Sequence, residues 1–152
     1  MVRIVCNAEE KRKIARLILE ALPEWFGIVE ARENYIIESA DEITVASMEG
    51  ETPNGFLCLK ETGKDTVELA VMGVLKEYHR RGIGTALFEA AKAIAVERGY
   101  AFLQVKTVQM GRYAEYDRTN LFYLALGFKE FEVFPTLWDA RNPCQIYVMS
   151  IE

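Results

Sequence analysis

The chain has 152 residues, 51% of them hydrophobic and 27% charged, which fits one domain, residues 1–152, with a single substantial core. A formal net charge of −5 disfavours a nucleic-acid partner and is compatible with a cationic substrate. The first residues lack the apolar stretch of a signal peptide and no later run approaches the length of a membrane span, so we expect a cytoplasmic protein with no membrane partner.

The three cysteines, Cys6, Cys58 and Cys144, are widely separated and each lies among apolar neighbours. An odd number of cysteines at this spacing favours buried free thiols over disulfides or a metal site. We therefore expect no metal.

The first half of the chain predicts a strand, two helices and a β-hairpin. These elements are expected over residues 2–6, 8–22, 28–39, 43–48 and 55–60. Asn7 is the expected N-cap of the first helix, because Glu10 follows three residues later as in a capping box. The connection between the two hairpin strands contains Gly50, Pro53 and Asn54, which are residues typical of turns.

The second half predicts a strand, a helix, a strand, a helix and two final strands. These are expected over residues 66–75, 84–98, 102–108, 115–126, 128–134 and 145–151. A long loop is expected over 135–144, between the last two strands. The strand–helix–strand unit requires two parallel strands, so together with the hairpin it predicts an α/β (α+β) fold with a mixed sheet.

The turn that leads into the helix at 84–98 has the sequence His79-Arg80-Arg81-Gly82-Ile83-Gly84. A helix begins with unpaired backbone N–H groups and a positive dipole end, and glycines leave room for an anion to approach them. The turn therefore predicts a phosphate site, although two glycines that only shape a tight turn would give the same pattern.

Spacing separates the phosphate motifs that such a turn can represent. A P-loop needs Lys after its second glycine, and Thr85 stands there instead. The dinucleotide pattern needs Gly or Ala at Leu87, and Gln104 lies where its acidic ribose ligand is sought. The pattern that fits is Q/R-x-x-G-x-G/A after a strand that ends in an apolar-Gly-Val triplet.

This pattern, carried by residues 71–87, resembles the signature of the GNAT superfamily of N-acetyltransferases. A second block, Phe122-Tyr123-Leu124-Ala125-Leu126-Gly127-Phe128, is similar to the F-Y-x-x-L-G-F block of the family. In element order the resemblance extends over residues 43–151. It implies a single-domain GNAT-like fold with a mixed central sheet of about seven strands and about four helices, and acetyl-CoA as co-substrate.

The resemblance also implies roles for individual residues. The cofactor-binding positions are Met72, Gly73, Val74, His79, Arg80, Arg81, Gly82, Ile83, Gly84 and Thr85. Tyr123 corresponds to the tyrosine that protonates the departing CoA thiolate, and Glu68 to the carboxylate base that takes a proton from the amine. Each also has an ordinary structural explanation, as a core aromatic and as an outward-facing strand carboxylate. Gly73 indicates either a backbone approach that splays this strand from residues 102–108 or relief of crowding under a helix.

Two positions depart from the family pattern. His79 replaces the usual Gln or Arg, and a histidine can still donate a hydrogen bond to a phosphate. Tyr116 stands seven residues before Tyr123, where some members have an Asn that contacts the cofactor. We do not assign that role to Asn120, which lies off this register.

The resemblance implies an amine acceptor, a small molecule or a peptide, whose identity stays open. Acceptor contacts are expected from the early helices and the late loop, at Trp25, Phe26, Glu33, Tyr35, Trp138 and Asp139. The first hypothesis is thus a monomeric or homodimeric N-acetyltransferase in which a primary amine attacks acetyl-CoA directly within a ternary complex. The alternatives are a non-catalytic module that binds CoA and regulates a partner, and a relative of the fold without a cofactor.

Overall fold

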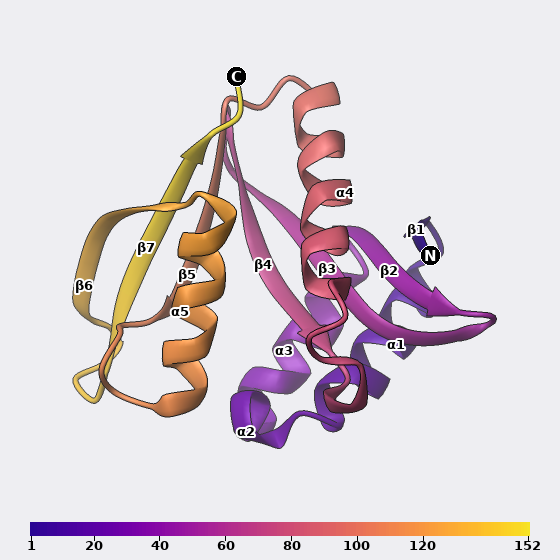
Figure 1. Cartoon of the computed structure of the whole chain (residues 1–152), viewed down its shortest axis with the longest axis horizontal. Helices are drawn as coiled ribbons and strands as arrows, with labels where there is room; N and C mark the ends of the chain where they lie inside the picture. The colour runs from indigo at the N-terminus through magenta and orange to yellow at the C-terminus, as the bar shows by residue number, and fades with distance from the viewer.

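A computed structural model describes all of residues 1–152 and shows a seven-stranded mixed sheet with five α-helices (Figure 1). The strands are β1 (Val2–Val5), β2 (Ile43–Glu49), β3 (Thr52–Gly63), β4 (Thr66–Val74), β5 (Phe102–Val108), β6 (Lys129–Asp139) and β7 (Asn142–Ser150). The helices are α1 (Ala8–Glu20), α2 (Pro23–Phe26), α3 (Val29–Ser39), α4 (Ile83–Glu97) and α5 (Ala114–Leu126), with a 3₁₀ turn, η1, at Lys76–Tyr78. The strand order is β1-β2-β3-β4-β5-β7-β6, and only β4 and β5 are parallel neighbours.

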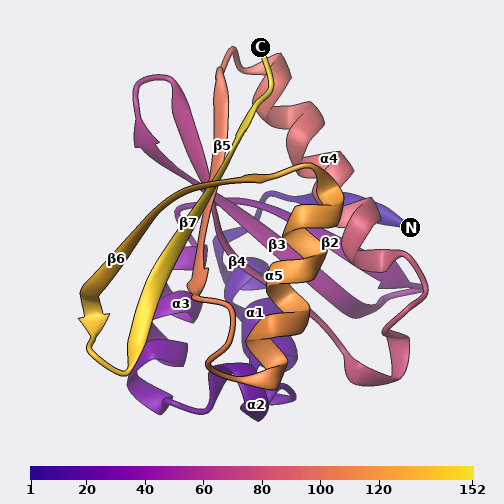
Figure 2. The same ribbon diagram turned by 60° about the vertical axis from the view of Figure 1, so that its left-hand side comes forward.

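Helices cover both faces of the sheet. Helices α4 and α5 lie on one face, and α1, α2 and α3 lie on the other (Figures 1 and 2). On the first face Leu87 and Phe88 of α4 pack with Tyr123 of α5 in one buried cluster. On the second face Ile18 of α1 packs with Phe56 of β3 in a separate cluster. The sheet thus separates two apolar cores, and each helix layer buries its apolar side chains against one face of the sheet.

A β-bulge divides β4 at Ala70. Leu69 pairs with Leu59 and Val71 pairs with the adjacent Cys58, so Ala70 has no partner residue on β3. Before the bulge Leu69 belongs to the core under α4, and after it Val71 belongs to the core under α1. The extra residue therefore reverses the face to which alternate side chains of β4 point.

Strands β4 and β5 separate soon after they pair. Their pairing covers only Thr66–Glu68 and Phe102–Gln104. Beyond that point β4 continues beside β3, while β5 continues beside β7 as far as the pairing of Val108 with Cys144. The splaying expected at Gly73 is therefore present, and its start coincides with the bulge. Gly73 itself relieves crowding, because a Cβ there would lie 2.9 Å from the Ile18 side chain of α1.

The structure confirms the α/β fold with a mixed sheet of seven strands. The expected N-cap is also confirmed, since Asn7 Oδ1 accepts a 2.9 Å hydrogen bond from the Glu10 backbone N–H. The carboxylate of Glu10 turns instead to Arg3, at 2.6 Å, so only half of the capping box forms. The predicted hairpin is present with longer strands, and α2 is a short fifth helix in the segment expected to interrupt the pattern.

Two expectations are wrong. The long loop over 135–144 is instead the end of the β6–β7 hairpin, in which the Asp139 carboxylate accepts hydrogen bonds from the backbone N–H groups of Arg141 and Asn142. Pro135 is compatible with β6 because this is an edge strand, where a missing donor costs little. Pro143 lies beside the turn at the start of β7, where it has no partner residue on β5 or β6. Cys6 is exposed rather than buried, although Cys58 and Cys144 are buried free thiols as expected. None of the helices combines the length and apolar composition that a membrane span needs.

Candidate active site

The start of α4 offers a group of unpaired backbone donors. The first hydrogen bond into the helix runs from the Ala86 N–H to the Gly82 carbonyl at 3.0 Å, so the N–H groups of Ile83, Gly84 and Thr85 precede it. Such groups, together with the positive end of the helix dipole, bind anions. The local geometry therefore supports the predicted phosphate site.

The two glycines of the turn serve different purposes. Gly82 is the N-cap and has φ +77°, a left-handed conformation that side chains disfavour, and a Cβ there would meet no atom within 4 Å. Gly84 has no such backbone constraint, but a Cβ there would lie 3.0 Å from Met72 and 3.2 Å from Phe122. Gly82 thus allows the left-handed backbone of the turn and leaves open space next to it. Gly84 allows Met72 and Phe122 to pack closely against the start of α4.

The remaining residues of the turn are held by contacts within the protein. His79 Nε2 lies 2.7 Å from the Val74 carbonyl oxygen, and its ring contacts Trp25 edge-on at 6.0 Å. Because a carbonyl only accepts, Nε2 is the protonated nitrogen of His79 in this arrangement. Arg81 lies over the Tyr78 ring at 5.1 Å. Arg80 adopts φ +64°, an uncommon conformation for a side chain of its size and one typical of functional turns.

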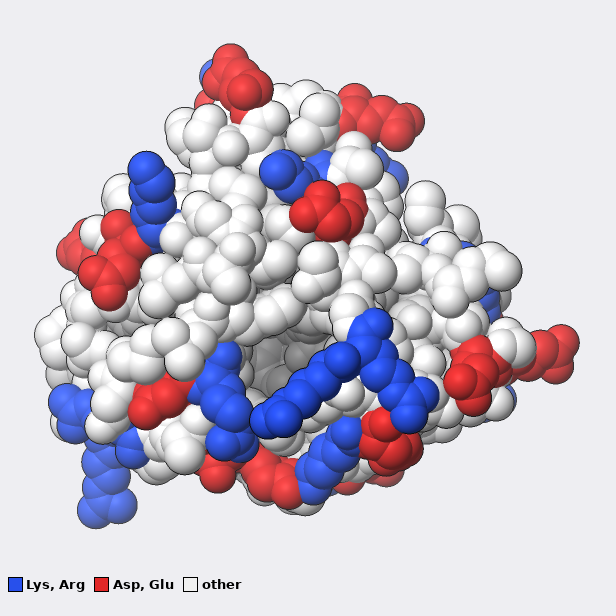
Figure 3. All heavy atoms as spheres, in the orientation of Figure 1, with Lys and Arg blue, Asp and Glu red and all other residues white.

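A cavity of about 810 Å³ begins at this turn and occupies the space between the separated strands. Its walls come from α2 and α3, the second half of β4, the start of α4, β5 and α5, and more than half of its lining residues are hydrophobic. Figure 3 shows the hollow opening between α4 and α5, with Lys and Arg side chains along its rim. Its volume and mostly apolar lining are typical of a ligand site.

Most of the predicted site residues line this cavity. They are Trp25, Phe26, Tyr35, Met72, Gly73, Val74, His79, Arg80, Gly82, Ile83, Gly84, Thr85, Tyr123, Trp138 and Asp139. Three predicted residues, Arg81, Glu33 and Glu68, are absent from the lining. The residues from the early helices and the late hairpin thus meet the glycine turn in one continuous space.

Tyr123 of α5 lines the cavity and packs among other aromatic side chains. It is only 7% exposed and contacts the rings of Phe122, Phe128 and Tyr147 at 5.7 to 6.2 Å. Burial raises the pKa of the Tyr123 phenol well above its usual value, and the neighbouring Tyr35 and Tyr116 raise it further. The phenol is therefore protonated at neutral pH and able to donate a proton into the cavity.

Glu68 lies in a polar contact between β4 and β5 and is not among the residues that line the cavity. Its carboxylate accepts a 2.8 Å hydrogen bond from Gln104 Nε2 and lies 3.1 Å from Lys106 Nζ. Its side chain is 12% exposed, whereas Lys106 itself lines the cavity. These contacts already occupy the carboxylate, and the role of Glu68 as the base stays a prediction.

Asn120 is fully buried and its side chain is occupied by the protein. Its amide donates to the carbonyl oxygens of Val108 at 2.9 Å and Tyr116 at 2.7 Å, and its Oδ1 accepts from the Tyr147 hydroxyl at 2.6 Å. These contacts hold the Asn120 side chain within the protein core, as expected for a residue without a cofactor role.

The sequence did not single out several charged and aromatic residues of the lining. They are Arg32, Tyr78, Lys106, Arg118 and Phe122. Phe122 belongs to the second family-like block, and its packing against Gly84 could have been sought from that motif. Arg32 and Lys106 belong to no motif. They line the cavity because of how α3 and β5 are oriented in the fold, which the sequence alone does not reveal.

A sheet that splits beside a glycine-capped helix, with a tyrosine buried at the split, defines an acetyltransferase fold. The chain belongs to the GNAT acetyltransferase family, because residues 39–130, more than half of the chain, match the family described as "Acetyltransferase (GNAT) domain". It is accordingly an N-acetyltransferase. Comparison with curated protein sequences gives no significant match.

Solved structures of this fold superimpose over the whole chain. A GNAT-family protein from Desulfovibrio desulfuricans has a TM-score of 0.83 at 18% identity, with 100% of this chain and 99% of that chain covered. An aminoglycoside 6'-N-acetyltransferase in complex with coenzyme A has a TM-score of 0.76 at 18% identity, with coverage of 100% and 97%. The ribosomal-protein-S18-alanine N-acetyltransferase of Escherichia coli has a TM-score of 0.78 at 18% identity, with coverage of 100% and 95%. At this identity the similarity shows a shared fold.

Proposed function

We propose that this protein transfers an acetyl group from acetyl-CoA to a primary amine, with both substrates bound at once in a ternary complex. The observation that carries the proposal is the continuity of the cavity from the start of α4 to Tyr123 and on to the aromatic residues of α2 and α3. One end has donors for a phosphate and the other has space for an acceptor. A direct attack requires this adjacency of the two substrates.

The residues at the start of α4 fit the pyrophosphate of acetyl-CoA. The free N–H groups of Ile83, Gly84 and Thr85 supply donors, and the open space over Gly82 leaves them accessible. Arg80 adds a positive charge at the cavity wall. The complex of a structural relative with coenzyme A supports the same ligand class for this cavity.

The second half of β4 fits the extended arm of the same ligand. Met72, Gly73 and Val74 line the cavity on the side from which β5 has separated, so their backbone is not covered by a neighbouring strand there. An arm that contains amides can form hydrogen bonds with such an uncovered strand. We propose that Met72 and Val74 orient the thioester in this way.

Tyr123 is the proposed general acid. Acetyl-CoA supplies an activated thioester, whose thiol must leave when an amine attacks the carbonyl. A phenol carries its proton at neutral pH even at its usual pKa, and burial raises the pKa of Tyr123 further; the residue also lines the cavity. We propose that it gives this proton to the departing thiolate, which leaves as the thiol, while the attacking nitrogen loses a proton to solvent and the phenolate regains one from solvent.

The acceptor is proposed to be a small-molecule or peptide amine, bound by Trp25, Phe26, Tyr35 and Trp138. These residues line the cavity, and Phe26 and Tyr35 contact each other edge to face at 5.9 Å. The structural relatives named above act on an aminoglycoside and on a ribosomal-protein alanine, which supports an amine as the acceptor class. We also propose a cytoplasmic monomer or homodimer, which fractionation and size-exclusion chromatography would test.

Calorimetric titration with acetyl-CoA, followed by thiol-release assays over a panel of amines, tests the proposal. We expect binding with heat and a rise in melting temperature, because a ligand of the folded state stabilises it, and release of thiol with at least one amine. Binding without release from any amine would favour the alternative, a non-catalytic module that binds CoA. No binding at all would contradict both functions.

A further inference from the structure

The acceptor end of the cavity contains an arginine that the family motifs do not involve. Arg32 lies on α3, which covers the face of the sheet opposite to α4 and its phosphate site (Figure 2). Its side chain lines the cavity together with Phe26 and Tyr35. Arg32 is therefore a cation on the α3 side of the cavity.

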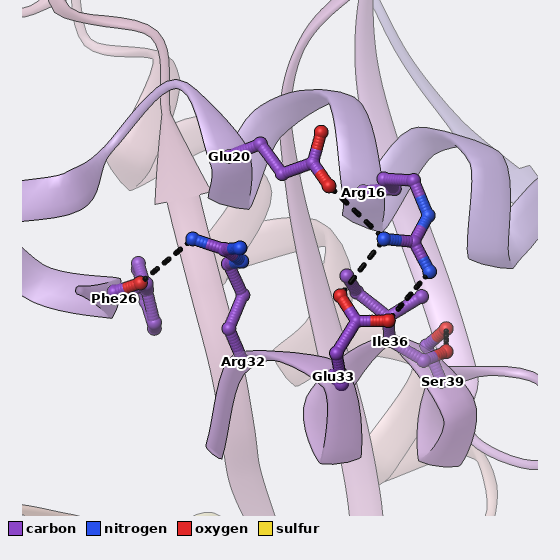
Figure 4. A network of polar contacts seen from close by, with 7 residues as sticks. All are labelled: Arg16, Glu20, Phe26, Arg32, Glu33, Ile36 and Ser39. Atoms are coloured by element: carbon purple, nitrogen blue, oxygen red, sulfur yellow. Dashed lines mark hydrogen bonds and ion pairs between the residues drawn. The ribbon is translucent and has the colours of Figure 1, made fainter. Parts of the chain in front are cut away.

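The orientation of α3 places the side chain of Arg32, and not that of its neighbour Glu33, in the lining of the cavity. The two residues are consecutive, so their side chains leave the helix about 100° apart. Glu33 turns outward and receives two 2.8 Å hydrogen bonds from Arg16 of α1, whereas Arg32 turns toward Phe26 (Figure 4). The carboxylate that the sequence suggested as a contact for an amine is thus removed from the cavity, and an arginine takes its place.

The guanidinium of Arg32 is poorly satisfied by the protein. Its hydrogen bonds include one to the Phe26 carbonyl, at the long distance of 3.4 Å, and its Nε is buried without a partner. It takes part in none of the five ion pairs of the structure. A guanidinium has five N–H donors in a planar fork, and leaving such donors unpaired in a partly buried place is costly.

The other charges near the acceptor end do not supply this missing partner. Asp139 lines the cavity, but its carboxylate accepts hydrogen bonds from Arg141 and Asn142 of its own turn. Lys106 also lines the cavity and is paired with Glu68. Glu115 lines the side of α5, and no ion pair joins it to Arg32. Glu33 acts on Arg32 only through its nearby charge, since its oxygens bond Arg16, so the acceptor end retains a guanidinium that forms no ion pair.

We propose that the acceptor amine carries a carboxylate, and that Arg32 binds this carboxylate and thereby selects the substrate. The inference rests on the proposed acetyl transfer and adds the chemical class of the acceptor. A carboxylate matches the fork of a guanidinium with two parallel hydrogen bonds and fixes the orientation of the molecule that carries it. Amino acids and peptides with an acidic group near the amine belong to this class, whereas polycationic amines do not.

Matched acceptor pairs test the proposal with the wild-type protein. Each pair consists of an amino acid and its carboxamide, with the amine one, two or three carbons from the carboxylate, and the thiol-release rate is measured at saturating acetyl-CoA. In at least one pair kcat/KM for the acid should exceed that for the amide by roughly 10- to 100-fold, the effect of one charge-assisted hydrogen bond. Equal or better turnover of the amide in every pair would overturn the inference but leave the acetyl transfer intact. Turnover of neither member in any pair, while another amine releases thiol, would overturn the inference but leave the acetyl transfer intact; release of thiol from no amine at all, with acetyl-CoA bound, would overturn both.

Substitutions of Arg32 test whether this side chain causes the preference for the acid over the carboxamide. In Arg32→Met the rate with the preferred acid should fall roughly 10- to 100-fold through KM, and the rate with its amide should change little. Arg32→Lys should recover part of the loss, because it keeps the charge without the fork. Arg12→Met, which removes an exposed arginine of α1 that does not line the cavity, should behave as wild type.

The affinity of the variant for acetyl-CoA shows whether Arg32 binds a carboxylate of the acceptor or a phosphate of the cofactor. Titration of Arg32→Met with acetyl-CoA should give the wild-type dissociation constant, and circular dichroism should show the wild-type fold. A comparable loss of acetyl-CoA affinity would place Arg32 on a phosphate of the cofactor and would overturn the assignment to the acceptor.

Discussion

The Tyr116 hydroxyl donates a 2.9 Å hydrogen bond to the backbone carbonyl of Trp25, which lies 91 positions earlier in the sequence. In return the Trp25 indole N–H donates to the carbonyl of Glu115 at 3.3 Å. Helices α2 and α5 cover opposite faces of the sheet, so these two bonds join the helix layers across the gap between β4 and β5 (Figure 1). Both side chains line the cavity, and their pairing fixes its width on that side.

Tyr116→Phe should therefore widen the acceptor end without affecting the cofactor end. We expect KM for the acceptor to rise about fivefold, the effect of one neutral hydrogen bond of about 1 kcal/mol, while acetyl-CoA affinity stays at its wild-type value. Steady-state kinetics and calorimetry measure the two quantities. Tyr113→Phe is the matched control, because Tyr113 is exposed and contacts Tyr116 only through its ring. An unchanged KM in Tyr116→Phe would show that the bond does not position the wall.

Gly82→Val should reduce acetyl-CoA affinity by at least about tenfold, because a branched side chain there strains the backbone and fills the space before the helix donors. Gly50→Val separates these effects. Gly50 also has a positive φ, +64°, and open space around it, but it lies in the β2–β3 turn away from the cavity. Both variants should lose stability, and only Gly82→Val should lose affinity in calorimetric titration. Retained affinity in Gly82→Val would refute the phosphate site.

Tyr123→Phe should lower kcat by roughly 100-fold or more, since general acid catalysis typically contributes that much, and should leave the dissociation constant of acetyl-CoA unchanged. The hydroxyl is the only group removed, so the aromatic packing with Phe122 and Phe128 is kept. Tyr147→Phe serves for comparison, because its hydroxyl binds Asn120 and its loss should reduce stability more than turnover. A wild-type kcat in Tyr123→Phe would exclude the proposed role.

Glu68→Gln should reduce kcat/KM by less than about tenfold, because the carboxylate does not line the cavity and acts on it only through Lys106. The shape of the rate profile against pH should also be retained if solvent rather than Glu68 takes the proton of the amine. A loss of several hundredfold together with a changed profile would restore Glu68 as the base. Glu89→Gln, at an exposed position of α4, controls for the change of net charge.

Glu42 should make stability depend on pH. Its side chain is nearly buried, and burial, with a further contribution from Glu38, raises the pKa of its carboxyl to about 7 from its usual value of 4.5. Between these values the unfolded chain releases the proton while the folded chain keeps it, so the stability falls as pH rises from 4.5 to 7. Glu42→Gln should therefore be more stable than wild type by on the order of 2 kcal/mol above pH 7 and equal to it below pH 4.5. Denaturant titrations at pH 4 and pH 8 compare the two chains, and an equal difference at both values would contradict the assignment.

Regular periodicity and short motifs allowed much of the fold to be predicted. The Asn7 cap, the first hairpin and the glycine turn depend on residues close together in the chain, and each was located correctly. The β6–β7 hairpin was missed because two prolines and a weak alternation looked like a loop. Whether a proline is tolerated depends on the position of its strand in the sheet, which is not a local property.

The site was predictable where a motif carried it and not elsewhere. Tyr123 and the turn residues belong to spaced patterns, and all of them except Arg81 line the cavity. Glu33 and Arg32 differ by a single position on α3, and the packing of α3 against α1 decides which of them enters the cavity. The bulge at Ala70 similarly changes the phase of β4 after Leu69, so simple alternation along the strand assigns the faces incorrectly beyond that point.

The divergence of β4 and β5 also bears on how the molecule avoids self-association. From Leu69 onward in β4 and from Val105 onward in β5, each strand has one edge without a neighbouring strand, and such edges are templates for pairing with other chains. Here both edges face the interior, behind the contact between α2 and α5, while the outer edges are the four-residue β1 and the charged, irregular β6. A substitution that separates α2 from α5 would therefore expose two long strand edges at once, and aggregation would accompany the loss of acetyl transfer.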